Sequence, residues 1–372
     1  MSVQVEVLDD FRAVPREEWD RLLAACPDST VFQSYGWIDA WIQAFGDDVH
    51  RQWIFAARQD GELVGVAPLW QGVGHRGSPR RSCVYFLGAS HADYLTFPAR
   101  GAAPQIVHAL LDAIDCRLPR GVAVELSEVP QFSTLACCLA ERAARRFAAV
   151  VLTGATPCPY LRIAGNDSMV DRVLRKQSLR RHRNGLKRLG EVTIQHLSAR
   201  ADVEPLLEGF FEQHVRRWSG TAWPSLFRRP QNRAFYRALA AQLEGSGQLL
   251  FSVVRLDGRP VAQHFGLRSR NDLIWYKPTF DIEFGRCSPG EVLLGSLIEY
   301  AREQGLRALD FTRGYEPFKS RFCSDVSFNN SYLWARDRWH RAVTRIRHST
   351  RRTAKRILAA ARASRSLPRV EP

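Results

Sequence analysis

The chain has 372 residues, of which 45% are hydrophobic, and it carries 53 Lys and Arg against 38 Asp and Glu. This composition excludes a disordered protein and provides for two domains of ordinary size. The sequence has no run of eighteen apolar residues to span a membrane and no secretory signal pattern at its start. Its eight cysteines include no Cys-x-x-Cys pair. We therefore expect a cytoplasmic protein with reduced thiols and no metal site.

The net charge of +15 is concentrated in two segments. Residues 171–188 carry +7 and residues 336–369 carry +11, which leaves −3 for the rest of the chain. The positive charge therefore belongs to two patches and is not a property of the whole surface.

The predicted elements of the first half are two helices, a β-hairpin, a strand, a helix and a strand. They occupy residues 16–25, 34–45, 53–65, 84–87, 104–117 and 122–126. The hairpin signal is Asp60-Gly61 between apolar runs, because this dipeptide favours a tight turn between two strands. A strand, a crossover helix and a further strand indicate a mixed sheet covered by helices.

The second half repeats the same order of elements. They occupy residues 203–218, 232–244, 250–262, 273–276, 289–304 and 308–311. The pattern Arg-x-Asp-Gly-x-x-Val occurs in both hairpins, beginning at Arg58 and at Arg255. This repeat favours a duplication, and it predicts an α/β fold of two similar domains at 1–155 and 160–335, followed by a basic tail at 336–372. The Gly- and Pro-rich residues 153–159 are typical of a linker between them.

The start of the predicted helix 289–304 is a candidate binding site. Ser288 as N-cap, Pro289 in the first turn and Glu291 three residues after the cap are typical of a capping box. A helix N-terminus reached from a strand through Ser288 and Gly290 also presents amides and a positive dipole end, which suit a pyrophosphate. The alternative is a well-capped helix without a ligand, and Glu291 favours it by competing for the same amides.

A second candidate site follows the strand 308–311. Asp310 and Glu316 are candidate bases there, while Arg313, Lys319 and Arg321 could hold an anionic group. Charged residues beyond the end of a buried strand lie where α/β sheets bind ligands. Aromatic residues alternate with these charges, which favours a packed wall over a solvated loop.

The sequence around these residues resembles the CelD-type acetyltransferases of the GNAT superfamily, which are linked to cellulose and exopolysaccharide biosynthesis. The similarity lies in Ser288-Pro289-Gly290, the helix that follows, and residues 309–319, where the family pattern Asp-Phe-x-x-Gly-x-x-x-Tyr-Lys is met with Phe318 in place of Tyr. Residues 31–38 and 214–218 resemble further family blocks. The resemblance implies tandem GNAT-like domains, with a more distant relation to Fem-type aminoacyl transferases.

The activity that this resemblance implies is transfer of an acyl group from acetyl-CoA or another acyl-CoA to an amine on a sugar or cell-envelope precursor. It places the donor at the helix start, with Asp310 and Lys319 as the catalytic residues. The usual CoA loop of the superfamily is replaced by residues 286–290. The expected donor-binding residues are Arg286, Ser288, Pro289, Gly290 and Glu291. The expected substrate-binding residues are Tyr276, Asp281, Arg313, Glu316, Gln263 and Arg183.

The two basic patches leave alternatives open. Residues 172–188 predict one basic helix, which is either a solvated face or a site for a phosphate-bearing acceptor. In a Fem-type transferase that uses charged tRNA, our alternative function, this helix would face the RNA. The tail could associate with an anionic membrane at the inner face, bind RNA, or only add solubility, and we favour the membrane. A non-enzymatic adaptor that binds membranes or nucleic acid is the third alternative.

Overall fold

The computed structural model describes residues 3–72, 83–119, 122–144, 150–221 and 224–335. The first half contains β1 (Gln4–Leu8), α1 (Arg16–Ala24), α2 (Tyr35–Phe45), β2 (Val49–Gln59), β3 (Glu62–Gly72), β4 (Cys83–Phe86), α3 (Pro104–Arg117), β5 (Ala123–Pro130) and α4 (Thr134–Ala144). The predicted helices and strands of this half are all present, with ends that differ by a few residues.

The second half begins with β6 (Val150–Arg162), α5 (Asp167–Leu174), α6 (Gln177–Lys187), β7 (Val192–Leu197), α7 (Arg200–Trp218) and α8 (Pro230–Gln242). It continues with β8 (Leu249–Leu256), β9 (Arg259–Ser269), β10 (Asp272–Phe280), α9 (Pro289–Glu303), β11 (Ala308–Asp310) and β12 (Asp325–Trp334). The one basic helix expected at 172–188 is instead two helices, because the chain leaves the helical path between α5 and α6 at Arg175 and Lys176.

Both predicted Asp-Gly turns are confirmed. Asp60 and Gly61 have φ of 51° and 83°, and Asp257 and Gly258 have φ of 48° and 80°. Two successive residues with positive φ give the turn whose twist matches a two-residue hairpin, and Asp and Gly tolerate that conformation. The turns set the pairing of β2 with β3 and of β8 with β9.

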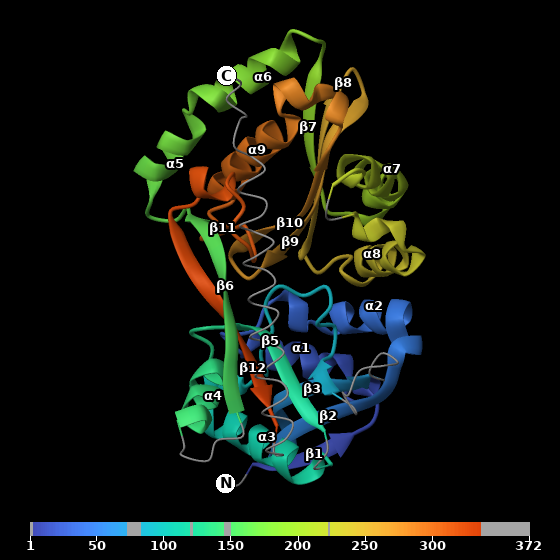
Figure 1. Cartoon of the computed structure of the whole chain (residues 1–372), viewed down its shortest axis with the longest axis vertical. Helices are drawn as coiled ribbons and strands as arrows, with labels where there is room; N and C mark the ends of the chain where they lie inside the picture. Colours follow the sequence, from blue (N-terminus) through green and yellow to red (C-terminus); the bar gives the residue numbers. More distant parts are fainter. Residues whose placement is uncertain (1–2, 73–82, 120–121, 145–149, 222–223, 336–372) are drawn as a thin grey trace, which may run out of the picture.

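A single sheet of twelve strands runs through both halves in the order β1-β2-β3-β4-β5-β12-β6-β11-β10-β9-β8-β7. The pairs β4–β5 and β10–β11 are parallel, and the other pairs are antiparallel. The mixed α/β fold expected from the sequence is therefore confirmed. In Figure 1 the long strands β6 and β12 cross the middle of the molecule and connect the lower, first half with the upper, second half.

The prediction of a linker at 153–159 was wrong, because these residues lie inside β6. A central strand forms backbone hydrogen bonds with a neighbouring strand on each side, and Pro157 and Pro159 have no N–H to donate. They are tolerated because β11 pairs only with 160–162; beyond it, the carbonyls of Pro159 and Pro157 accept single hydrogen bonds from Phe311 and Gly314. The expected domain boundary at 155–160 thus falls within a strand that both halves share.

The last strand, β12, lies between the strands of the two halves although it is at the end of the described chain. It pairs with β5 on one side and with β6 on the other. The two halves are therefore joined through a continuous hydrogen-bonded ladder. The basic tail predicted at 336–372 lies outside the described residues.

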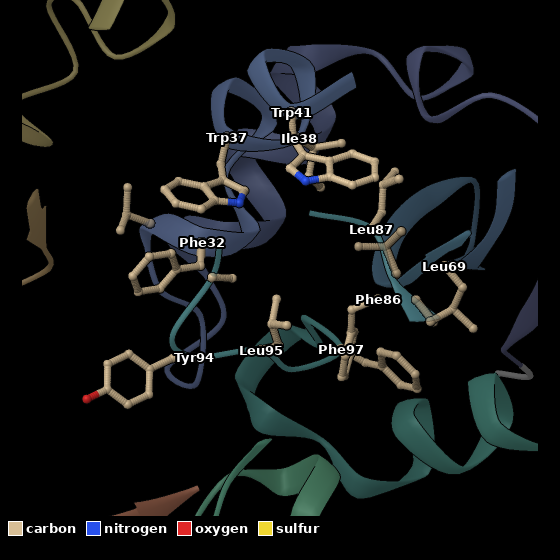
Figure 2. Packing of buried hydrophobic residues seen from close by; sticks show 14 of the residues in the cluster. Phe32, Trp37, Ile38, Trp41, Leu69, Phe86, Leu87, Tyr94, Leu95 and Phe97 are labelled. Atoms are coloured by element: carbon tan, nitrogen blue, oxygen red, sulfur yellow. The ribbon is translucent and has the colours of Figure 1, made fainter. Parts of the chain in front are cut away.

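Two large hydrophobic cores cover the sheet. The first combines the helices of the first half with α7 and α8 of the second, and the other packs α5, α6 and α9 on the opposite face of the second half. Figure 2 shows the part of the first core around Trp37 and Trp41 of α2, with Tyr94 at its edge and the Tyr94 hydroxyl turned away from the cluster. The described helices include none that is long and apolar enough to cross a membrane.

Candidate functional site

The parallel strands β10 and β11 separate after three paired residues. Residues 272–274 pair with 308–310, after which β11 ends while β10 continues to Phe280. On its other side β10 has a bulge against β9 between Ile274 and Lys277. A cavity of about 500 Å³ lies where the strands have separated.

In the first half, the chain itself fills the corresponding separation of β4 from β5. Only residues 83–85 pair with 123–125. Beyond them the Leu95 amide donates to the carbonyl of Glu128 on β5, at 2.8 Å. Leu95 and Phe97 are buried there. The two halves have the same strand arrangement. The cavity of about 500 Å³ lies in the second half.

The cavity is lined from both faces of the sheet. The end of α7 contributes His214, Arg217 and Trp218, β10 contributes 275–280, the start of α9 contributes Ser288, Gly290, Glu291 and Leu294, and the segment after β11 contributes Phe311, Thr312, Arg313, Glu316, Phe318, Lys319, Arg321 and Phe322. Trp275 packs in the core under α9, whereas its neighbour Tyr276 packs in the core under α7 and α8. The cavity therefore has an α9 side and an α7 side.

Asp93, from the first half, also reaches the cavity. Its carboxylate is 2.7 Å from Nε of Arg313, and Arg313 Nη1 donates to Glu128 of β5 at 2.9 Å. Asn329 of β12 donates to the carbonyl of Asp93 and to the carboxylate of Glu128. The first half thus fixes the position of a cavity residue that the second half supplies.

Lys319 forms hydrogen bonds within the segment that follows β11. It is 4% exposed, and its Nζ donates to the carbonyls of Arg313 and Gly314 at 2.9 and 3.3 Å. The same Nζ lies 2.7 Å from a carboxylate oxygen of Glu316, whose side chain is 55% exposed. Lys319 therefore shapes this wall and holds Glu316, which keeps access to solvent and to the cavity.

The start of α9 differs from the predicted capping box. Ser288 has φ of 42° and its side chain caps no helix amide, while the amide of Glu291 donates to the Ser288 carbonyl. The Glu291 carboxylate instead accepts from Ser178 of α6 at 2.8 Å and from Arg321 at 3.1 Å. This buried carboxylate places a negative charge near the positive end of the α9 dipole.

Two cations of the cavity lie in apolar surroundings. Burial lowers the pKa of Lys277 to about 8 and that of Arg217 to about 10. Lys277 Nζ lies 3.8 Å from the ring centre of Tyr276, and the guanidinium of Arg217 lies 4.3 Å from that of Phe280. Burial also lowers the pKa of His214 to about 3, so this imidazole, hydrogen-bonded to Ser225, is neutral at physiological pH.

Residues 174–320 match the family model of the acetyltransferase (GNAT) domain. This segment is a GNAT acyltransferase domain. This match contains β10, α9, β11 and most residues that line the cavity, so the cavity lies within the GNAT domain. No curated protein matches the sequence.

Solved structures show the same fold over both halves. The crystal structure of FemX aligns with a TM-score of 0.61 at 13% identity, covering 87% of this chain and 96% of that one. The structure of L-PGS from Bacillus licheniformis aligns with a TM-score of 0.53 at 14% identity, covering 91% and 96%. The C-terminal domain of a putative lysylphosphatidylglycerol synthetase from Agrobacterium fabrum aligns with a TM-score of 0.53 at 12% identity, covering 90% and 95%. At these identities the likeness concerns the fold.

The GNAT cavity brings together about half of the residues predicted from the sequence. They come from β10, from the start of α9 and from the segment after β11. They are Tyr276, Ser288, Gly290, Glu291, Arg313, Glu316, Lys319 and Arg321.

The remaining predicted residues do not line the cavity. Asp310 accepts hydrogen bonds from the Tyr94 hydroxyl and the Thr312 amide, both at 2.7 Å, at the contact between the halves. Of the two candidate bases, Glu316 lines the cavity and Asp310 does not. The other predicted residues outside it are Arg286, Pro289, Asp281, Gln263 and Arg183.

Three of these residues have other partners. Arg183 of α6 forms an ion pair with Glu299 of α9 at 2.5 Å. Asp281 accepts from Arg259 at 2.5 Å and caps the short helix that begins at Ile282. Gln263 is buried against Gln213 of α7. Their contacts hold the GNAT domain together, and their expected ligand-binding roles stay predictions.

The cavity also contains residues outside the expected set of catalytic and binding residues. Asp93 comes from the other half of the chain, and Arg217 comes from a helix of which only the family block 214–218 was noted. Lys277 was adjacent to a predicted site residue, and its partial burial depends on its position over the ring of Tyr276. The sequence signal that could have identified Arg217 and Lys277 is a basic residue next to an aromatic one, a pattern that is also common on ordinary surfaces.

A GNAT domain implies acyl-CoA as its co-substrate, and the α9 side of the cavity fits an acyl chain with its pantetheine arm. Its wall is apolar and includes Trp275, Leu294 and Phe311. A Cβ on Gly290 would lie only 3.3 Å from Phe280, so glycine lets the start of α9 pack closely against this ring of the cavity wall. Among the described residues, no group of three or more His, Cys, Asp or Glu is placed to hold a metal ion.

Proposed function

We propose that this protein is an N-acyltransferase that moves an acyl group, most simply acetyl, from acyl-CoA to an amine on a sugar or cell-envelope precursor. The observation that carries the proposal is the cavity between β10 and β11, which is lined by residues from both faces of the sheet. One face would take the donor and the other the acceptor. The resemblance to CelD-type enzymes supports an exopolysaccharide precursor as the acceptor.

In this reaction the amine nitrogen bonds to the acyl carbon as the carbon–sulfur bond breaks. The ammonium must first lose a proton, and the leaving thiolate gains one. Glu316 is the proton acceptor in our proposal, because it lines the cavity and Lys319 holds it at 2.7 Å. The buried Lys319 is a positioning residue in this scheme.

Glu316→Gln tests this assignment. General-base catalysis contributes about 10²–10⁴-fold, so we expect kcat to fall at least about 100-fold while KM for the donor changes little. Glu303→Gln, at the exposed end of α9, is the matched control and should retain full activity. Equal kcat for Glu316→Gln and the native chain would remove Glu316 from the mechanism.

Calorimetric titration with acetyl-CoA and longer acyl-CoA esters tests the donor. We expect saturable binding that Gly290→Glu abolishes, because the added side chain fills the α9 side beside Phe280. Gly209→Glu introduces the same charge on an exposed turn of α7 with open space around it, and should leave binding unchanged. Binding that survives in Gly290→Glu would contradict the donor position.

Glu291 favours the second candidate function, a Fem-type transferase that takes its acyl group from charged tRNA. Its carboxylate lies near the α9 N-terminus, where it competes with a donor pyrophosphate for positive charge. The fold shared with FemX agrees with this alternative. Failure of every CoA ester to bind, with acyl transfer from aminoacyl-tRNA, would establish it in place of the first.

A further inference from the structure

The proposed acyl transfer needs a proton donor for the sulfur that leaves the acyl carbon. Glu316 takes a proton from the amine in that scheme, so a second group must protonate the sulfur. This donor must line the cavity, carry a proton that it can release near neutral pH, and be free of a partner that already holds that proton. These three requirements exclude most of the cavity-lining residues that the structure describes.

Most of the polar side chains of the cavity are already occupied or are too weak as acids. Burial lowers the pKa of His214 to about 3, and the neutral imidazole is a very weak acid. The Tyr276 hydroxyl donates to a main-chain carbonyl of the first half at 2.6 Å, and burial raises its pKa. The Lys319 ammonium donates to two carbonyls, and the carboxylates of Asp93 and Glu291 form ion pairs with arginine side chains. A guanidinium does not release its proton near neutral pH.

Lys277 meets all three requirements. It lines the cavity, three residues beyond Ile274, the last residue of β10 that pairs with β11. Its ammonium lies 3.8 Å from the ring centre of Tyr276 and forms no ion pair or hydrogen bond with any residue that the structure describes. Lys277 therefore borders the place where the two strands separate, and its three N–H groups are free for a ligand.

The surroundings of Lys277 make its ammonium more acidic than that of an exposed lysine. Burial lowers its pKa to about 8; one acid opposes this shift and two cations add to it. The acid is Asp93 of the first half, and the cations are Arg313 and Lys319 after β11. His91 and His214, whose pKa values burial lowers to about 4 and 3, also lie near enough for the charge of Lys277 to act on them. An acid with a pKa near the working pH is protonated and still releases its proton readily.

We propose that Lys277 is the general acid of the acyl transfer and protonates the departing sulfur. This inference rests on the proposed function and adds a catalytic residue to it. As the carbon–sulfur bond breaks, its electron pair passes to the sulfur, and one proton passes from the Lys277 ammonium to that sulfur to give the free thiol of CoA. Glu316 then releases to water the proton that it took from the nitrogen, and Lys277 regains one from water, so both groups return to their starting forms.

Chemical labelling of the full chain tests the free ammonium without any acyl donor. Trinitrobenzenesulfonate reacts with neutral amines, and peptide mass spectrometry gives its rate at each lysine as the pH is raised. We expect labelling of Lys277 to rise with a midpoint near pH 8. Lys319 is the internal control, because it is 4% exposed and its ammonium is held by oxygen acceptors, and it should react at least about tenfold more slowly. A midpoint for Lys277 near the usual lysine pKa of about 10.4 would overturn the proposal.

Turnover of acetyl-CoA with glucosamine as the amine tests the proton transfer. Lys277→Arg keeps the positive charge but does not release a proton, so we expect kcat to fall about 100-fold, the lower end of the range for general acid–base catalysis. In the native chain kcat should fall above about pH 8, where Lys277 loses its proton, and the variant should lack this decrease. Arg216→Lys, at an exposed position of α7, is the matched control and should retain the native kcat and pH profile.

A second thioester distinguishes proton donation from a structural effect of the substitution. An acetyl ester of an aromatic thiol releases a thiolate that needs no protonation, so with it Lys277→Arg should lose less than about threefold. An equal loss with both thioesters, or a native kcat in Lys277→Arg, would overturn the role of Lys277 while the acyl transfer stands. If the native chain transfers no acyl group from either thioester although Lys277 titrates near pH 8, the proposed function fails, and this role of Lys277 fails with it.

Discussion

Asp310 sits at the contact between the two halves with its charge poorly solvated. Burial raises the pKa of this carboxyl from 3.8 to about 7, although the Tyr94 hydroxyl and the Thr312 amide both donate to it. An acid with a raised pKa in the folded state stabilises the fold when protonated. Its contribution is complete below about pH 4 and is lost as the pH rises through 7.

Asp310→Asn should therefore stabilise the protein at alkaline pH. The amide oxygen can accept the same two hydrogen bonds and carries no charge. One pKa unit corresponds to about 1.4 kcal/mol, and partial solvent access reduces the gain, so we expect about 1–2 kcal/mol in the free energy of unfolding at pH 8. The difference should shrink at pH 5. Urea unfolding at both pH values measures it, and an equal change at the two would contradict the raised pKa.

The contact between α2 and α8 joins the halves at the scale of secondary-structure elements. Trp37 of α2 packs against Phe235 of α8 with ring centres 5.2 Å apart, and Gln242 at the end of α8 donates to Asp39. A Cβ on Gly36 would lie 3.1 Å from the Gln242 carbonyl oxygen. Glycine at this position therefore sets how closely the helices approach.

Gly36→Leu should separate the two helices. Inserting a large side chain into a packed contact costs about 1–3 kcal/mol, and we expect that loss in the free energy of unfolding. Gly209→Leu makes the same exchange in an exposed part of α7 with no neighbour within 4 Å, where the better helix propensity should stabilise by roughly 0.5–1 kcal/mol. Thermal unfolding of both variants checks the opposite signs; a gain from both would show that α2 and α8 are not tightly packed.

Local patterns predicted most elements but only part of the site. The Asp-Gly turns and the helix predicted at 289–304 depend on residues close in sequence, and the structure contains both. The strand β6 was missed because its prolines are acceptable only where β11 ends. The capping box failed because Ser178 and Arg321, both distant in sequence, bind Glu291. Asp93 and Arg217 join the cavity only through contacts between elements, which no local pattern reports.

At the scale of the whole molecule, the site depends on both halves. Asp93 and Glu128 of the first half hold Arg313, and Asn329 of β12 holds both of their segments. The Tyr276 hydroxyl donates to the carbonyl of His91 at 2.6 Å. The first half, which has no such cavity described between β4 and β5, therefore fixes the position of residues that line the cavity of the second half.

Two truncations test this dependence. A chain that ends at Ala335 retains β12, and we expect it to unfold cooperatively like the full chain. A chain that ends at Ser324 lacks the strand between β5 and β6, so protease resistance should fall in both halves. Limited proteolysis with mass spectrometry identifies which half is cut. If the first half of the chain that ends at Ser324 resisted proteolysis as well as in the full chain, β12 would not be needed for the stability of that half.

The chain that ends at Ala335 also tests whether the positive charge of residues 336–369 binds an anionic membrane. We expect the full chain to sediment with phosphatidylglycerol vesicles at low salt and the truncated chain to stay in the supernatant, because each basic residue near an anionic surface contributes about 1 kcal/mol. Raising the salt concentration should release the full chain. Equal sedimentation of both chains would rule out the tail as the membrane-binding segment.

The position of β12 also has a consequence for synthesis on the ribosome. β5 is finished at Pro130, but the strand that covers its free edge begins only at Asp325. At ~5–20 residues per second, the nascent first half waits roughly 10–40 s with an open strand edge. Such an edge readily pairs with other chains. We therefore expect soluble yield to depend on chaperones that act during translation, and slower growth at low temperature to aggravate this dependence.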